Sequence, residues 1–201
     1  MTGASRSAVN PVVTAKSAVT RRAILDAARE VFVRKGYSGT RVMDIAARLH
    51  VTRANFYYYF HDKQQLFIEL GTEAYRESLT AIKAFDELGA SPAITEVLVW
   101  VSNYFDYLER NGAFVARSIG DLPDDPTFTA TVARLHKRAA RTLGEHIVAR
   151  SSAELSSPVS LGITVMAMLE RSWLLVSTAD VPISADAAIR SNAEILTQLM
   201  R

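Results

Sequence analysis

The stretch "TRVMDIAARLHVTRANFYYYF", residues 40–60, contains two short helix-forming runs with a tight turn between them. In the second run, Phe56 and Phe60 are about one helical turn apart, so both rings point to the same side. In the first run, Ile45 and Ala46 supply an apolar side of their own. Two short helices that pack against each other across such a turn form a helix-turn-helix. The sequence therefore predicts this motif near its N-terminus.

The side of the second helix opposite the two phenylalanines must face solvent, and its residues suit duplex DNA. An arginine can fork onto guanine, an asparagine can pair with adenine, and an alanine methyl can touch a thymine methyl. Tyrosine hydroxyls donate to phosphate oxygens, and their rings add stiff contact area. Thr52 at the helix start and Lys63 beyond its end would add phosphate contacts. The residues predicted on this surface are Arg53, Ala54, Asn55, Tyr57, Tyr58 and Tyr59. For Tyr59, packing against the following helix with only the hydroxyl exposed is an equal alternative.

Helices are expected on both sides of this pair. Upstream, residues 20–36 place apolar side chains at helical spacing, with Thr20 suited to the N-cap and Gly36 to the left-handed position that ends a helix. Downstream, Asp62 and Gln65 have the spacing of a capping box. They predict a longer fourth helix that reaches to about residue 85.

The composition is typical of a well-packed globular protein, since 49% of the 201 residues are hydrophobic and 22% are charged. There is no cysteine, which excludes disulfides and thiolate metal sites and fits a reducing cytoplasm. The net charge of +2 hides a split: residues 1–63 carry 11 Lys/Arg and 4 Asp/Glu, whereas residues 64–201 carry 12 and 17. A basic N-terminal third indicates that one end meets a polyanion, with chance clustering as the alternative.

Beyond residue 85, loop signals rich in Gly, Pro, Ser and Asp divide the chain into further helical segments. No segment alternates with a period of two for long enough to predict a strand. The expected helices lie near residues 92–110, 112–120, 126–150, 158–178 and 184–200. The sequence therefore predicts an all-α fold, in which an N-terminal three-helix helix-turn-helix domain is followed by a C-terminal helical bundle.

The most apolar stretch, residues 160–176, is interrupted by Glu170 and Arg171. These charges favour a buried helix over a membrane span, so no membrane partner is expected. Glu170 needs an explanation of its own, because an unpaired carboxylate in apolar surroundings is costly. It could pair with Arg171 or Arg117, lie at a dimer interface, or meet the polar group of a ligand, and the three alternatives are equal.

The motifs of common enzymes do not occur: the sequence has no G-x-S-x-G, G-x-G-x-x-G, Walker loop or H-E-x-x-H. Its four histidines are scattered without metal-ligand spacing. We therefore expect no catalytic residue, no metal site and no cofactor.

Residues 18–70 resemble the DNA-binding domain of the TetR family of bacterial transcriptional regulators. The resemblance lies in a helix that ends in "VFVRKGYSGT", a second helix with "IA", and then "VTRANFYYYFHDK". It implies a DNA-binding domain over residues 18–64 and an effector-binding and dimerisation domain over 65–201. Residues 1–17 would form a flexible N-terminal arm.

The resemblance also implies roles for particular residues. Thr40 and Arg41 of the second helix would touch phosphates or bases, and Thr52 and Arg53 would enter the major groove. The other implied contacts are Tyr57 on a phosphate, Tyr58 on base edges or sugar, Lys63 on the flank, and electrostatic support from Lys16, Arg21 and Arg22.

Three residues depart from the family pattern. His50 stands where the family usually has a glycine in the turn, at a position that tends to need a positive φ. A strained or altered turn is therefore expected, with His50 able to reach toward a phosphate. Ala54 and Asn55 replace the common Gly-Thr pair, so the resemblance implies no particular base preference.

For the rest of the chain, the resemblance implies a homodimer through the last two helices, near 158–178 and 184–200. Such a dimer would bind a palindromic operator in double-stranded DNA. A small hydrophobic or amphipathic effector would lie in the bundle, against apolar and aromatic walls with a few polar groups. Each candidate wall residue could also belong to a filled core. These candidates are Trp100, Asn103, Tyr104, Tyr107, Phe114, Phe128, Met166, Glu170 and Trp173.

The function implied is that of a cytoplasmic, ligand-responsive transcriptional repressor. An effector would shift the fourth helix and change the spacing of the two DNA-binding domains, so that both half-sites can no longer be bound together. The alternative is a DNA-binding structural or interaction protein of the same fold that has no small-molecule effector.

Overall fold

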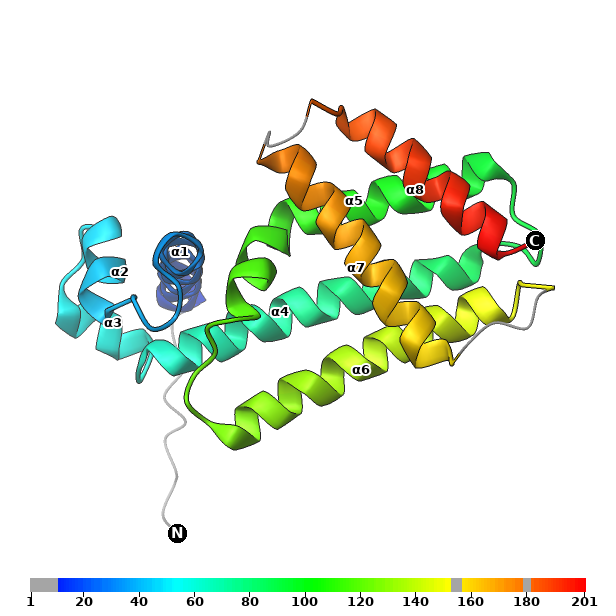
Figure 1. Ribbon diagram of the computed structural model, residues 1–201. Helices are drawn as coiled ribbons and strands as arrows, with labels where there is room; N and C mark the ends of the chain where they lie inside the picture. Colours follow the sequence, from blue (N-terminus) through cyan, green and yellow to red (C-terminus); the bar gives the residue numbers. More distant parts are fainter. Residues whose placement is uncertain (1–10, 153–156, 179–181) are drawn as a thin grey trace, which may run out of the picture. The chain divides into compact units, whose positions relative to one another are not determined.

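The computed structural model describes residues 11–152, 157–178 and 182–201, and these residues contain helices but no strand (Figure 1). The helices are α1 (Pro11–Lys35), α2 (Val42–Arg48), α3 (Arg53–Tyr59), α4 (Lys63–Lys83), the 3-10 helix η1 (Ala84–Glu87), α5 (Ile94–Ser118), α6 (Pro126–Val148), α7 (Pro158–Ser177) and α8 (Ala185–Leu199). The chain divides after Leu70 into two compact units. The all-α prediction is confirmed.

Aromatic side chains from three helices form the core of the first unit. Phe56 and Phe60, which were predicted to point inward, are buried, and their ring centroids are 6.1 Å apart. Phe32 of α1 meets Phe67 of α4 edge-on, with ring centroids 5.2 Å apart. Burial of one such side chain contributes about 1.5–3 kcal/mol. These four rings are therefore a large part of what holds the unit together.

Helix α1 is longer than the sequence indicated. It begins at Pro11, a residue well suited to the first helical position, so residues 11–17 are helical rather than part of a flexible arm. The remainder of that expected arm, residues 1–10, lies outside the described residues. Thr20 is consequently inside the helix and is not its N-cap. Its hydroxyl donates to the carbonyl of Lys16 at 3.0 Å.

Two connections in the first unit use the left-handed backbone region. Gly36, which follows α1, has a φ of 73°, as the sequence predicted. His50, between α2 and α3, has a φ of 55° and is the only non-glycine residue with a positive φ in the described ranges. A β-carbon makes this conformation unfavourable. The departure from glycine at His50 therefore places local strain in the turn.

In the second unit, α7 packs against α5, α6 and α8, and its contact with α6 depends on two glycines. A β-carbon at Gly162 would lie 1.8 Å from the carbonyl oxygen of Ala140. One at Gly144 would lie 1.8 Å from the carbonyl oxygen of Pro158. Each helix thus presents a glycine to the backbone of the other, which allows their axes to approach closely.

Helix α5 is continuous, although the sequence predicted two helices near 92–110 and 112–120. Gly112, which was interpreted as a helix end, lies within α5 and is buried. A β-carbon there would be 2.5 Å from the ring of Trp173 on α7. The glycine therefore makes room for an indole and does not form a turn.

Among the described helices, α7 is the one long and apolar enough to cross a membrane by length and composition alone, with a mean hydropathy of 1.5. Leu161, Val165 and Leu169 on this helix are nevertheless buried in the core of the second unit. These are the contacts of a core helix. Only 33% of its most apolar window is buried, however, so part of its surface remains uncovered.

The strained turn leads to a prediction for stability. Replacing His50 with glycine should stabilise the first unit by about 1 kcal/mol, because glycine adopts a positive φ without steric cost. Replacing it with alanine, which keeps the β-carbon, should give no comparable gain. Chemical denaturation of the two variants and the parent protein measures the difference. Equal stability of His50→Gly and His50→Ala would contradict the assignment of strain to this turn.

Candidate nucleic-acid interface

Helix α3 presents a row of polar and aromatic side chains to solvent. Its N-cap is Thr52, whose hydroxyl accepts from the backbone N–H of Asn55 at 3.1 Å. Tyr57 is 43% exposed and Tyr58 is 78% exposed, values that are unusual for such large rings. The other predicted members of this surface are also exposed: Arg53, Ala54 and Asn55.

Arg53 and Tyr57 support each other on this surface. The Arg53 guanidinium lies 5.4 Å from the centroid of the Tyr57 ring, and its Nη2 donates to the Tyr57 hydroxyl at 3.4 Å. The Tyr57 ring in turn packs edge-on against buried Phe56, with centroids 5.4 Å apart. An arginine held against a ring has less side-chain freedom to lose when it binds. The pair therefore projects a partly ordered guanidinium from α3.

Tyr58 and Tyr59 differ in exposure although they are adjacent. Their rings meet edge-on at 4.9 Å, but Tyr58 is exposed whereas Tyr59 is half-buried. Of the three tyrosines, Tyr58 has the most surface to offer a partner.

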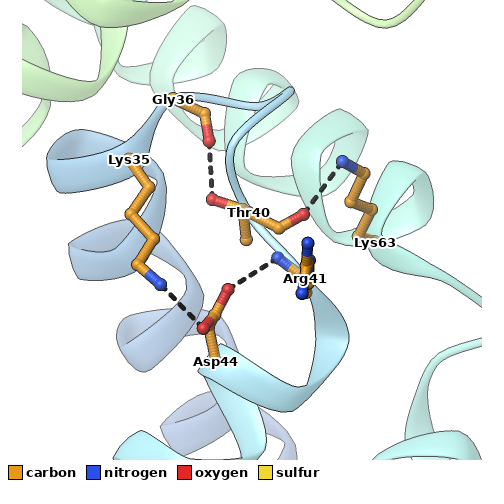
Figure 2. Close-up of polar contacts among 6 residues, drawn as sticks. All are labelled: Lys35, Gly36, Thr40, Arg41, Asp44 and Lys63. Atoms are coloured by element: carbon orange, nitrogen blue, oxygen red, sulfur yellow. Dashed lines mark hydrogen bonds and ion pairs between the residues drawn. The ribbon is translucent and has the colours of Figure 1, made fainter.

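The loop between α1 and α2 is fixed by a small polar network (Figure 2). Asp44 accepts from the Lys35 ammonium at 2.7 Å and from the backbone N–H of Arg41 at 2.9 Å. These two hydrogen bonds, the first being the stronger influence, lower the pKa of the Asp44 carboxyl. The side chain of Arg41 is exposed at the start of α2. The network thus sets the position of one predicted DNA-contacting cation.

Thr40 requires a correction. It was expected to touch phosphates or bases, but it is only 1% exposed, and its hydroxyl donates to the carbonyl of Gly36 (Figure 2). A buried hydroxyl with an internal acceptor cannot reach DNA without a rearrangement of the loop. The role supported by these contacts is to hold the end of α1 against the start of α2.

Lys63 also has partners within the unit. Its ammonium donates to the carbonyl of Tyr37 at 2.7 Å and to that of Thr40 at 3.0 Å, and it lies 4.2 Å from the centroid of the Tyr37 ring. Figure 2 shows it reaching from α4 toward the loop. These contacts favour a role for Lys63 in positioning the loop that carries Arg41.

Arg21 was considered a source of electrostatic support for DNA, and it too is engaged. Its guanidinium forks onto the carboxylate of Glu69, with Nη2 to Oε2 at 2.6 Å, and lies 4.5 Å from the centroid of Phe60. It therefore ties α1 to α4 and covers one of the phenylalanines beneath α3.

Sequence reasoning missed two features of this surface. Met43 on α2 is 66% exposed, although a methionine at helical spacing reads as a core residue. The Lys35–Asp44 ion pair was also missed, since it joins two helices. The hydrogen bond between Asp44 and the Arg41 backbone could have been predicted, because Asp44 stands three residues after Arg41, the position of an acidic residue in a capping box.

Most of the candidate effector residues lie in the core of the second unit. Trp100, Tyr104, Tyr107, Met166 and Trp173 are buried in one hydrophobic cluster. The others vary in exposure: Phe114 is buried, Phe128 and Glu170 are half-buried, and Asn103 is exposed. Asn103 therefore does not line the interior as predicted, because it falls at the margin of the buried face of α5.

The tryptophans and tyrosines of this cluster differ in how their polar atoms are satisfied. Trp100 donates its indole N–H to the carbonyl of Ala81 at 2.9 Å, and Trp173 donates to the carboxylate of Glu109 at 3.0 Å. The hydroxyls of Tyr75 and Tyr104 are buried and have no hydrogen-bond partner in the described part of the chain. Buried hydroxyls of this kind call for an explanation.

A separate open groove of about 490 Å³ lies near the end of the chain, and none of the candidate effector residues lines it. Arg150 is on its wall, but the guanidinium donates to the carbonyls of Leu88 and Gly89 at 2.6 and 3.0 Å. This arginine therefore fastens the end of α6 to the segment before α5.

Comparison with known proteins supports the assignment of the first unit. The family described as "Bacterial regulatory proteins, tetR family" matches residues 24–70. The HTH-type transcriptional regulator RutR of Escherichia coli (strain K12) is 37% identical over 67 residues, which cover 33% of this chain and 32% of RutR. Among the curated relatives, the matched segment spans between 24% and 46% of the relative's length. These matches therefore bear mainly on the DNA-binding part.

Solved structures extend the likeness to most of the chain. The fatty acid degradation regulator FadR of Bacillus halodurans superimposes with a TM-score of 0.68 at 18% identity, covering 95% of this chain and 97% of FadR. A protein of Saccharomonospora viridis, solved in complex with choline, gives 0.67 at 17% identity, covering 90% and 96%. At these identities the likeness shows a shared fold. Residues 24–70 are thus similar to the TetR family of bacterial regulatory proteins, and most of the chain shares the fold of these solved structures.

Proposed function

We propose that this protein is a transcriptional regulator that binds operator DNA through α3 and acts as a repressor. The observation that carries the proposal is the exposed surface of α3, where Arg53, Asn55 and Tyr58 are all exposed on a helix anchored from behind by buried phenylalanines. Exposed aromatic side chains that are grouped with polar ones often mark an interaction site. A surface with guanidinium, amide and phenol groups matches the base edges and phosphates of a major groove.

The contacts divide into two kinds. Arg53 and Asn55 would read base edges, since guanidinium and amide groups form the two-bonded pairs that distinguish guanine and adenine. Tyr57, Thr52 and Arg41 would hold phosphates and set the position of α3 on the duplex. Ala54, between the two reading residues, would lie against a thymine methyl. Thr40 and Lys63 would act indirectly, by holding the loop before α2.

We further propose that the protein is a homodimer through α7 and α8. Ile163 on α7 and Ile195 on α8 are 43% and 48% exposed, and two-thirds of the apolar window of α7 is not buried within the chain. An uncovered apolar face of this kind favours association with a second copy. A two-fold dimer would present two α3 helices to successive major grooves, and thus favour a palindromic operator.

The second unit is proposed to bind a small apolar or amphipathic effector that releases the DNA. Helix α4 contributes residues to both units, so a ligand-dependent change in it could alter how the DNA-binding parts are presented. Release requires that the effector bind more tightly to the form that cannot hold DNA. Two structural neighbours, one a fatty acid degradation regulator and one solved in complex with choline, support a small organic ligand. Such a regulator would act in the cytoplasm and would need no catalytic residue or cofactor.

The second candidate is a DNA-binding structural or interaction protein of the same fold without an effector. The observation that favours it is the dense packing of Trp100, Tyr104 and Trp173 in the core of the second unit. The two candidates differ in one measurement, which is whether any small molecule weakens operator binding. A screen of metabolite-like compounds against the operator complex separates them.

The DNA-binding surface can be tested by selecting an operator from random duplexes with the full-length protein. Replacing Arg53 with alanine should then cost about 1–3 kcal/mol of operator binding and relax the preference at one position of the site. The control is Arg141→Ala, which removes an exposed cation from α6 in the second unit. Retention of full affinity and preference by Arg53→Ala would show that α3 does not read the bases.

A second test separates positioning from phosphate contact. Because the Lys63 ammonium is bound to two carbonyls, Lys63→Met should lower the melting temperature and weaken binding to all sequences, but change the salt dependence little. Arg41→Ala, which removes an exposed cation, should reduce the slope of log K against log salt by about 0.9. The measurement is a salt titration of both variants. A slope change for Lys63→Met as large as that for Arg41→Ala would assign Lys63 to a phosphate instead.

The proposed dimer leads to a third prediction. Replacing Ile163 and Ile195 with arginine should produce monomers, because each copy would then place two positive charges in an apolar interface. Sedimentation velocity measures the change, and binding to a full palindrome should fall toward that of a single half-site. Val99→Arg, at a 62% exposed residue of α5, is the matched control. If the double variant sediments like the parent, the interface lies elsewhere.

A further inference from the structure

A row of aromatic residues runs along the inner face of α5. Trp100, Tyr104 and Tyr107 are spaced by four and three residues, and neighbouring ring centroids are 5.4 and 5.5 Å apart. Tyr104 has no exposed surface, yet its hydroxyl has no hydrogen-bond partner among the described residues. The hydroxyl of Tyr75, which packs against the same cluster from α4, is in the same situation. The interior of the second unit thus contains polar atoms that its own chain does not satisfy.

Glu170 faces the same cluster from α7. It lies four residues after Met166 and three before Trp173, and both of these are buried in the cluster, so the three side chains share one face of the helix. No described residue forms an ion pair or a hydrogen bond with its carboxylate. Arg171 and Arg117, the partners considered from the sequence, are exposed and do not pair with it. A carboxylate therefore stands on an apolar face without a counter-ion.

The electrostatic environment agrees with this geometry. Burial raises the pKa of Glu170 from its ordinary value of 4.5 to about 7. Burial first, and then the charges of Glu170 and Tyr107, raise the pKa of Tyr104 well above its ordinary value. An apolar or amide residue in place of Glu170 would avoid the cost of a buried unpaired charge, and perturbed groups of this kind gather at functional sites.

From this arrangement we propose that the second unit binds an organic ammonium ion with an apolar body, and that Glu170 is its counter-ion. The ammonium N–H groups would donate to the Glu170 carboxylate and to the Tyr104 hydroxyl oxygen. The faces of Tyr104, Tyr107 and Trp100 would attract the positive charge and cover the adjoining methylene groups. An anionic ligand would be repelled, because the group it would meet is the Glu170 carboxylate and not a cation. This inference rests on the proposed effector site and names the chemical class of its ligand.

The test uses four probes with the same ten-carbon tail: decylamine, decyltrimethylammonium, decanol and decanoate. Binding to the full-length protein is measured by calorimetry at pH 7, below the concentrations at which the probes form micelles. We expect decylamine to bind at least about ten-fold more tightly than decanol, and decanoate to bind least well. Decyltrimethylammonium, which has the charge but no N–H, should fall between decylamine and decanol. Preference for decanol or decanoate, or binding of no probe, would overturn the proposal.

Variants assign the preference to the residues. Glu170→Gln keeps the shape and should remove the preference for decylamine over decanol while leaving decanol binding unchanged. Tyr104→Phe removes only the hydroxyl and should weaken decylamine binding a few-fold. Glu145→Gln, at an exposed residue of α6, is the matched control and should bind like the parent. An unchanged decylamine preference in Glu170→Gln would refute the role of Glu170.

Stability supplies a readout that does not depend on any ligand. At pH 8, Glu170→Gln should melt at a higher temperature than the parent, because the parent then carries an unpaired buried charge. A lower melting temperature would mean that the carboxylate already has a stabilising partner, which contradicts the proposal.

The operator complex separates this inference from the proposed function. If decylamine binds through Glu170 but does not release DNA, the effector mechanism fails and the ammonium site stands. If decanoate alone releases DNA, the effector mechanism stands and the ammonium site fails.

Discussion

The burial of Phe56 and Phe60 is the constraint on which the DNA-binding surface depends. Helix α3 has only seven residues, a length at which an isolated helix is not stable in water. The two rings hold it against the core of the first unit, and Thr52 caps its start. Because the buried side is fixed, the opposite side is fixed as well, so the exposure of the α3 residues follows from the core. Arg21 reinforces this arrangement, since it covers the Phe60 ring and is itself held by Glu69.

Several of the basic residues in the N-terminal third are paired within the first unit, so the total charge overstates what is left for DNA. Lys35 pairs with Asp44, and Arg48 pairs with Glu30. Lys63 and Arg21 are likewise occupied by partners within the unit. These cations build the scaffold, and their charge is partly compensated before any DNA arrives. The electrostatic attraction for DNA would therefore come from a smaller set of cations, in which Arg41 and Arg53 are the exposed members nearest the turn. This division accounts for the contrast expected between the Lys63 and Arg41 variants.

The sequence predicted well where a residue's role depends on near neighbours. The inward pair on α3 and the left-handed Gly36 both follow from spacing within about one helical turn. At Asp62 the cap was also correct, since its carboxylate accepts from the Gln65 N–H at 2.8 Å, but the Gln65 side chain accepts from His61 instead of Asp62. Apart from the start of α1, the errors arose where distant segments decide. Gly112 looked like a helix end because the Trp173 ring that occupies its space is about sixty residues away in sequence. Thr40 and Asn103 were misassigned because their burial or exposure depends on packing between helices.

Helix α7 shows how the two proposals for the second unit are connected. Ile163 and Glu170 are seven residues apart and so lie on nearly the same side of α7, where Ile163 is exposed and Glu170 is half-buried. The close glycine contacts with α6 leave this helix little freedom to adjust, since its backbone already touches that of its neighbour. A cation that neutralises Glu170 would therefore act on an element that also forms the proposed dimer surface. A ligand can shift a conformational equilibrium only by its difference in affinity for the two states. The unpaired carboxylate provides such a difference, because its cost is greatest in the state that buries it without a counter-ion.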